Sequence, residues 1–158
     1  MNNKPKTSSI SITNVKFGLE VQIVEPCNLY GCTLEDRVFV GPFVEIQAGV
    51  VVGKGTRVQS HAFLCEGVTV GADCVISHGA MFINDRFRSG PARGDRSKWG
   101  KTVLADRVYV GTHATILPVR ICSDVVIGAG AVVTKDIVEP GTYVGNPARK
   151  ILPSKSST

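Results

Sequence analysis

Two histidines, His61 and His78, could accept a proton or bind a substrate near neutral pH. They lie 17 positions apart, one short of the 18 residues that make up three of the six-residue repeats described below. Three such repeats complete one coil of the predicted structure, so we expect the two histidines on neighbouring coils, at the same corner. In this placement the two histidines could act as a base for a nucleophilic substrate or could bind it. A pair of corner histidines that packs in a subunit interface fits it equally well.

The segment from Ile83 to Thr102 carries most of the net charge, because six basic residues there oppose two acidic ones in a chain of net charge +5. It also contains Trp99, the only tryptophan. A solvated surface loop can have this composition, but a positive flap beside a groove also suits a ligand rich in phosphates, such as coenzyme A or a nucleotide-diphosphate sugar. The charged residues are Arg86, Arg88, Arg93, Arg96, Lys98 and Lys101, with Asp85 and Asp95.

A six-residue repeat positions these groups. Apolar anchor residues recur at every sixth position, and a small or β-branched residue stands two positions before each. A period of six is a multiple of the two-residue period of strands and does not fit a helix, so the repeat predicts short strands joined by corners in a β-solenoid. The anchors of the uninterrupted run are Leu34, Val40, Ile46, Val52, Val58, Leu64, Val70, Ile76 and Phe82.

The rhythm is interrupted twice. Phe82 and Leu104 are 22 residues apart, which leaves 16 more than one repeat needs and predicts a loop within residues 83–102. The step from Ile116 to Ile121 is five residues, with Pro118 between them. Counting anchors predicts about five coils, with a capping segment over residues 1–33, a β-helix over 34–150 and a tail over 151–158.

Composition adds bounds. Hydrophobic content is 43% with 6% aromatic residues, as expected for a narrow core of Val, Ile and Ala. No apolar run approaches the length of a membrane span, and no secretory signal is visible, so we expect a cytoplasmic protein. Five cysteines without a Cys-x-x-Cys pair indicate reduced, buried thiols. The net charge is too small to argue for nucleic-acid binding.

The repeats, together with Ile127–Asp136 (IGAGAVVTKD) and Val144–Arg149 (VGNPAR), resemble the hexapeptide-repeat acyltransferases. The resemblance covers nearly the whole chain. It implies a left-handed parallel β-helix, a homotrimer and acetyl-CoA as co-substrate.

A narrower resemblance rests on Phe82–Arg86 (FINDR), Glu45–Gln47 (EIQ), Gln59–Glu66 (QSHAFLCE) and Ala114–Val119 (ATILPV). These segments are similar to bacterial N-acetyltransferases of UDP-2-acetamido-3-amino-2,3-dideoxy-glucuronate, which supply sugars for surface polysaccharides such as the O-antigen of lipopolysaccharide. The implied partner is therefore a nucleotide-diphosphate amino sugar.

The reaction places chemical demands on the site. A sugar amine attacks a thioester carbonyl, and an amide oxygen could orient that amine by accepting an N–H bond. An amine with a pKa near 8 is partly neutral at pH 7, so a strong base is not required. Asn84 is the expected orienting residue, with His78 as the second catalytic candidate; a turn-forming asparagine is the alternative. The implied substrate-binding residues are His61, Phe82, Asp85 and Arg86.

The C-terminal repeats resemble the acyl-CoA half of such a site. Gly128, Ala129 and Ala131 would offer backbone to the pantetheine arm. Lys135, Arg149 and Lys150 would supply cations for the phosphates.

Three alternatives remain. An N-acetyltransferase of dTDP-3-amino-3,6-dideoxyhexoses would use the same motifs. A carbonic-anhydrase-like zinc enzyme would need three convergent histidines, but His61, His78 and His113 lack a closely spaced pair, so no metal is expected. A non-catalytic scaffold would need a flat, unbroken face, which the basic loop interrupts.

Overall fold

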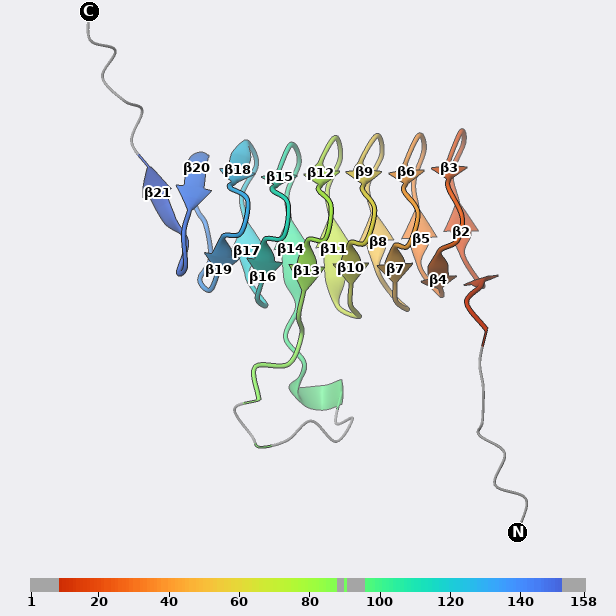
Figure 1. Cartoon of the computed structure of the whole chain (residues 1–158), viewed down its shortest axis with the longest axis horizontal. Coiled ribbons are helices and arrows are strands. Elements are labelled where there is room, and N and C mark those ends of the chain that lie inside the picture. The colour runs from red at the N-terminus through yellow and green to blue at the C-terminus, as the bar shows by residue number, and fades with distance from the viewer. Residues whose placement is uncertain (1–8, 88–89, 91–95, 152–158) are drawn as a thin grey trace, which may run out of the picture.

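Short parallel strands of two to four residues follow one another along the chain and stack coil upon coil (Figure 1). The computed structural model describes residues 9–87, 90 and 96–151. Successive strands belong to three sheets in turn, which form the sides of a prism and which we name A, B and C. The predicted fold class, an all-β parallel β-helix with one long protruding loop, is confirmed.

The bounds of the strands follow the order of the coils. Sheet A contains β1 (Ile12–Thr13), β4 (Asn28–Tyr30), β7 (Glu45–Ile46), β10 (Phe63–Leu64), β13 (Met81–Phe82), β16 (Thr115–Ile116) and β19 (Val132–Val133). Sheet B contains β2 (Lys16–Phe17), β5 (Thr33–Leu34), β8 (Val51–Val52), β11 (Val68–Val70), β14 (Thr102–Leu104) and β17 (Arg120–Ile121). Sheet C contains β3 (Gln22–Ile23), β6 (Phe39–Val40), β9 (Arg57–Val58), β12 (Val75–Ile76), β15 (Tyr109–Val110), β18 (Val125–Ile127), β20 (Gly141–Val144) and β21 (Arg149–Ile151).

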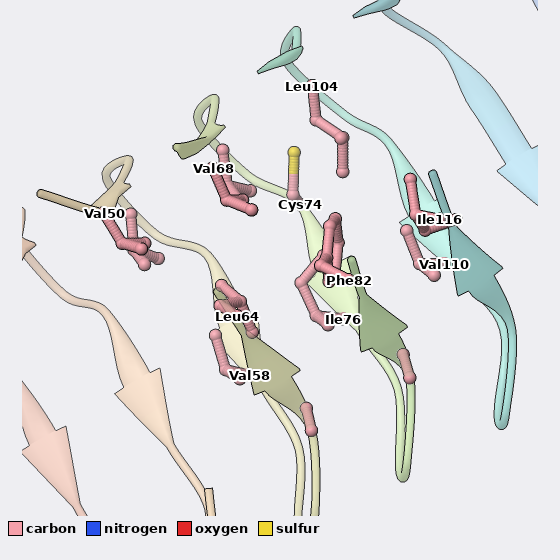
Figure 2. Packing of buried hydrophobic residues seen from close by; sticks show 14 of the residues in the cluster. Val50, Val58, Leu64, Val68, Cys74, Ile76, Phe82, Leu104, Val110 and Ile116 are labelled. Atoms are coloured by element: carbon pink, nitrogen blue, oxygen red, sulfur yellow. The ribbon is translucent and has the colours of Figure 1, made fainter. Parts of the chain in front are cut away.

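The six-residue repeat builds the core because its two apolar columns point inward. Each anchor is in register with the anchor one coil away, as Phe82 is with Ile116. Anchors such as Leu64 and Ile76 are fully buried and pack as continuous rows (Figure 2). The residue between the two columns faces outward, since side chains alternate along a strand. The core is therefore a narrow stack that runs the length of the prism.

The coil number is a correction to the sequence-based count. Sheet A has seven strands, so the described chain forms seven coils rather than about five. The segment before Leu34, expected to be an irregular cap, forms one full coil of β1, β2 and β3 and the first strand, β4, of the next. Its residues Phe17, Ile23 and Leu29 are in register with Leu34, Val40 and Ile46. A five-residue step from Leu29 to Leu34 hides this continuity in the sequence.

The two ends of the prism differ. At the N-terminal end, the anchor Phe17 is 50% exposed because no described coil covers it. At the C-terminal end, β21 turns back antiparallel on β20, and an isolated bridge between Ile121 and Ile137 continues sheet B. None of the helical segments described is long and apolar enough to cross a membrane.

Two of the three corners carry the residues of interest. The loop corner joins sheet A to sheet B, and the long loop leaves it after β13 and returns at β14, with the short 3-10 helix η1 (Arg96–Lys98) on its return path (Figure 1). The histidine corner joins sheet C to sheet A and contains His61, His78 and His113.

Candidate active site at the loop corner

Asn84 lies at the root of the long loop, where it is half-buried. Its side-chain Nδ2 donates a hydrogen bond to the carbonyl oxygen of Glu66 at 3.0 Å. Its own carbonyl oxygen accepts a hydrogen bond from the backbone N–H of Gly100 at 2.8 Å. This bond joins the first segment of the loop to the last one. With the amide nitrogen held against Glu66, the amide oxygen of Asn84 faces the other way as an acceptor.

The two interruptions of the repeat meet at this root. Arg86 donates a hydrogen bond from its guanidinium to the carbonyl oxygen of Pro118, the proline of the second interruption. Gly100 lies so close to the Pro118 ring that a Cβ on Gly100 would stand 2.4 Å from the Cβ of Pro118. Asp85 accepts a hydrogen bond from the N–H of Phe87 at 2.7 Å and closes the first turn of the loop. The loop is therefore fastened to the next coil at Pro118.

Four residues form a column along the loop corner. Glu66, Asn84, Pro118 and Lys135 each stand two positions after an anchor of sheet A, and these anchors are in register from coil to coil. Because neighbouring strands are about 4.8 Å apart, Asn84 and Lys135 are separated by about 10 Å along the prism. A single corner thus connects the loop root to the C-terminal end.

A hollow of about 310 Å³ lies at the C-terminal end of this column. Lys135, Arg149 and Lys150, three cations predicted to bind phosphates, line it together with Tyr143. Lys150 donates a hydrogen bond from Nζ to Glu139 at 3.0 Å, and this bond raises the pKa of the lysine. The guanidinium of Arg149 donates to the carbonyl oxygen of Ala148 at 2.9 Å. The structure therefore brings Lys135 beside Arg149 and Lys150, which follow it by 14 and 15 positions in the sequence.

The histidine corner has a different geometry. His61 stacks on Phe43 of the preceding coil, with ring centroids 4.9 Å apart and planes 12° from parallel. The N–H of His113 donates to the carbonyl oxygen of His78 at 3.0 Å, and all three histidines are exposed. The expectation that His61 and His78 share a corner on neighbouring coils is confirmed, because the N–H of Gly79 donates to the carbonyl oxygen of Ser60.

Asn84 and His78 do not meet within one copy of the chain. His78 lies at the histidine corner and Asn84 at the loop corner, with the sheet A strand β13 between them. A site that used both residues would need the histidine corner of another copy.

Several expected contacts need correction. Phe82 is fully buried in the core, so its side chain has no surface for a ligand. Ala131 is also fully buried, and both its backbone groups are engaged, with the N–H bonded to the oxygen of Gly128 and the oxygen to the N–H of Thr115. A Cβ on Gly128 would stand 2.7 Å from a methyl group of Val144, so this glycine serves close packing. Ala129 is exposed.

The structure describes only part of the basic loop. Arg86, Lys98 and Lys101 are within it, whereas Arg88, Arg93 and Asp95 lie outside the described residues. Trp99 is half-buried at the returning end of the loop. Over the described ranges, no group of three or more His, Cys, Asp and Glu residues could hold a metal ion.

Glu66, Gln47 and Pro118 are site residues to which the sequence reasoning gave no role. Glu66 and Pro118 occupy the same position after an anchor as Asn84, so reading the corner column would have found them. Gln47 enters only through a hydrogen bond from the N–H of Glu66 at 3.1 Å. No spacing in the sequence indicates that bond.

Comparison with known families agrees with the repeat. Residues 31–66 match the model described as bacterial transferase hexapeptide (six repeats), and residues 104–135 match the hexapeptide repeat of succinyl-transferase. These two matches lie within the repeats of the prism and together cover less than half of the chain. In proteins with hexapeptide repeats, stacked parallel coils of this kind form a left-handed β-helix, the form that the resemblance implies.

Three known proteins are similar to this chain. It is 27% identical over 153 residues to the bifunctional protein GlmU of Thermodesulfovibrio yellowstonii, a match over 90% of this chain and 34% of the relative. The chain thus spans about a third of the length of the curated relatives it matches. A serine acetyltransferase structure from Neisseria gonorrhoeae is 30% identical, with a TM-score of 0.58 over 70% of this chain and 41% of that one.

The third relative is a variant of AntD, an N-acyltransferase from Bacillus cereus solved with dTDP and coenzyme A. Its TM-score is 0.70, its identity 23%, and the alignment covers 90% of this chain and 84% of that one. At this identity the likeness concerns the fold. Solved proteins of this fold therefore include one that holds both a nucleotide and coenzyme A.

Proposed function

We propose that this protein transfers an acetyl group from acetyl-CoA to the 3-amino group of a UDP-linked 2-acetamido-3-amino-2,3-dideoxy-glucuronic acid. The observation that carries the proposal is the loop-corner column. It puts the anchored amide of Asn84 and the basic hollow at Lys135 and Arg149 on one corner, about 10 Å apart along the prism. The motifs around Asn84 favour a 3-amino sugar as the acceptor.

Asn84 supplies the amine end of the reaction. Its Nδ2 is held by Glu66, so Oδ1 accepts an N–H of the sugar amine and directs the nitrogen lone pair toward the thioester carbonyl. The nitrogen then forms a bond to the acetyl carbon, and the carbon–sulfur bond breaks as the coenzyme A thiolate leaves. The amine proton passes to the thiolate by way of His78.

The C-terminal hollow supplies the cofactor end. Lys135 and Arg149 provide exposed cations for phosphate groups, while Lys150 is engaged with Glu139. The pantetheine arm would run from this hollow along the loop corner past Pro118 to Asn84. Ala129 lies on the histidine corner, between β18 and β19, so it is a candidate backbone contact only from a neighbouring copy. Phe82 and Ala131 are not carried into the proposal because they are buried.

The site is completed by a second copy in a homotrimer. Large apolar side chains are exposed on the histidine corner and on the two sheets that flank it. They are Phe43 at 57%, Met81 at 41%, Tyr109 at 44% and Val126 at 39% exposure. Burying them against a neighbouring copy would bring a histidine corner toward a loop corner, and so His61 and His78 toward Asn84. The enzyme would act in the cytoplasm on precursors of a surface polysaccharide.

An N-acetyltransferase of dTDP-3-amino-3,6-dideoxyhexoses is the second candidate, favoured by the dTDP bound to the Bacillus cereus N-acyltransferase of the same fold. The test is to incubate the purified protein with acetyl-CoA and each nucleotide sugar, and to measure the release of free thiol. Faster turnover of the UDP-linked amino-uronate is expected. Preference for the dTDP sugar would replace the first candidate with the second, and turnover of neither would overturn both.

A further inference from the structure

A chain of hydrogen bonds crosses three coils and ends on Asn84. Gln47 donates from Nε2 to the carboxylate of Glu45 at 3.1 Å. The side-chain oxygen of Gln47 accepts the backbone N–H of Glu66 at 3.1 Å. The carbonyl oxygen of Glu66 accepts Nδ2 of Asn84 at 3.0 Å. The four residues are half-buried, which limits competition from water.

Each bond in this chain fixes the direction of the next group. An ionised carboxylate only accepts hydrogen bonds, so Glu45 selects the nitrogen side of the Gln47 amide. The oxygen side of Gln47 is then directed at the N–H of Glu66. The two bonds at Glu66 involve different peptide groups, because its N–H belongs to the peptide before it and its carbonyl oxygen to the peptide after it. Gln47 therefore affects Asn84 by fixing the position of the Glu66 backbone, and not by polarising one shared peptide group.

The polarity at the end of the chain matters for the chemistry. An Asn84 amide held by its nitrogen presents an oxygen, which can accept an N–H from an amine. An amide turned by 180° would present N–H donors to the same amine and would compete for the lone pair that attacks the thioester. Holding the backbone of Glu66 in place is therefore a way to keep Asn84 in the useful orientation.

We propose that Glu45 and Gln47 are positioning residues, which act through Glu66 to orient the amide of Asn84 for the acceptor amine. The proposal rests on the proposed function. It adds residues that do not touch the substrate in this arrangement and predicts a loss of rate rather than of cofactor binding.

Gln47→Ala tests the proposal in the full-length protein. We expect kcat to fall by about tenfold to a hundredfold, because a displacement of about 1 Å at a reacting group costs up to this factor. The affinity for coenzyme A, measured by calorimetry, should change by less than about twofold, because the basic hollow lies two coils beyond Asn84. Glu45→Gln, which keeps an accepting oxygen, should retain more activity than Glu45→Ala.

Glu35→Ala is the matched control. Glu35 accepts the backbone N–H of Lys54 at 3.0 Å, an inter-coil bond of the same kind on a different corner. This variant should lose as much thermal stability as Gln47→Ala but keep its kcat. Equal losses of kcat in both variants would assign Gln47 a purely structural role and overturn the proposal.

A second measurement does not depend on turnover. The side-chain amide resonances of Asn84 in a nitrogen–proton spectrum, assigned with Asn84→Asp, should shift and exchange faster with water in Gln47→Ala but not in Glu35→Ala. Unchanged resonances would overturn the positioning chain even in an active enzyme. If wild-type protein transfers no acetyl group, the proposed function fails, while these resonances still decide whether the chain of bonds holds Asn84.

Discussion

Asn84 and Gly79 occupy corners of the same coil, and the two corners use side-chain space in opposite ways. Asn84 is anchored by one bond from its nitrogen, which leaves its oxygen as the chemically useful atom. Gly79 has a φ of +64° and leaves room for the imidazole of His113, whose Nδ1 would lie 2.6 Å from a Cβ on the glycine. At both positions a neighbouring coil decides what the residue can do.

Asn84→Ala removes the oxygen that would orient the amine. We expect normal folding and a loss of most of the turnover, measured as thiol release from acetyl-CoA. Asn28→Ala, which changes an asparagine on the sheet A strand β4, three coils away from Asn84, is the control and should leave turnover unchanged. Near-wild-type activity of the Asn84 variant would remove this residue from the mechanism.

Gly79→Ala should destabilise the protein by more than the backbone strain of a positive φ alone. A positive φ costs a non-glycine residue about 1 kcal/mol or more, and the added methyl group would also displace the ring of His113. Gly130→Ala is matched, because Gly130 lies on the same corner with a φ of +67° and has no atom within 4 Å of an added Cβ. Chemical denaturation of both variants separates the two costs; equal losses would mean that the imidazole moves aside freely.

The buried thiols predict a pH dependence of stability. Burial raises the pKa of Cys32 and that of Cys65 to about 11 from 9.0. The unfolded chain therefore loses these protons first, so stability is fully present below pH 9 and falls as the pH rises toward about 11. Each thiol contributes on the order of 2 kcal/mol to this fall. The free energy of unfolding, measured with urea at several pH values in this range, should fall less steeply with pH in Cys65→Ala than in the wild type. An unchanged dependence on pH would contradict the assignment to this thiol.

At the scale of elements, the long loop and the Pro118 step form one unit. Gly100 packs on Pro118, Arg86 donates to its carbonyl oxygen, and the hydroxyl of Thr102 donates to the carbonyl oxygen of Leu117 at 3.3 Å. The loop leaves and rejoins the helix without disturbing register, because Val68 on β11 remains opposite Thr102 on β14. The scaffold and the loop are consequently separable.

Excision of residues 84–99 removes 16 residues and restores six positions between Phe82 and Leu104. The shortened protein should fold, because Ile83 and Gly100 would then complete an ordinary corner. It should lose acetyl transfer, because Asn84 and Arg86 are removed. Circular dichroism, thermal unfolding and thiol release measure these outcomes, and a shortened protein that still transfers acetyl would show that the loop is dispensable.

At the scale of the whole molecule, the proposed site is distributed over two corners that a single copy keeps apart. In a trimer with cyclic symmetry each copy would use its own loop corner and the histidine corner of one neighbour. The exposed apolar residues beside the histidines identify the face that such neighbours would bury.

Mixed trimers test this sharing. Asn84→Ala and His78→Ala copies should each be inactive alone, because each lacks one half of every site. Refolded together in equal amounts, they should regain activity at about a quarter of the interfaces, those in which neither half is altered. Light scattering measures the number of subunits in each sample. An active monomer, or mixtures as inactive as the single variants, would contradict the shared site.

The sequence by itself determined the β-helix, the position of the loop and the burial of the anchors, because a six-residue repeat imposes the same inward and outward alternation on every coil. It missed the N-terminal coils, since the five-residue step at Leu29 to Leu34 breaks the visible period while backbone pairing continues across it. Phe82 was assigned to the substrate from its motif, whereas its anchor position already placed it in the core.

Only the tertiary structure decided which residues meet. Coils of 17 and 18 residues, and one longer by the loop, bring Glu66, Asn84, Pro118 and Lys135 into one column. The bonds that orient Asn84 each join a side chain to the backbone of the adjacent coil, 18 or 19 positions away in the sequence, and no local spacing encodes them. Residues that are far apart along the chain come into contact only when the coils stack, so these contacts exist only in the folded prism.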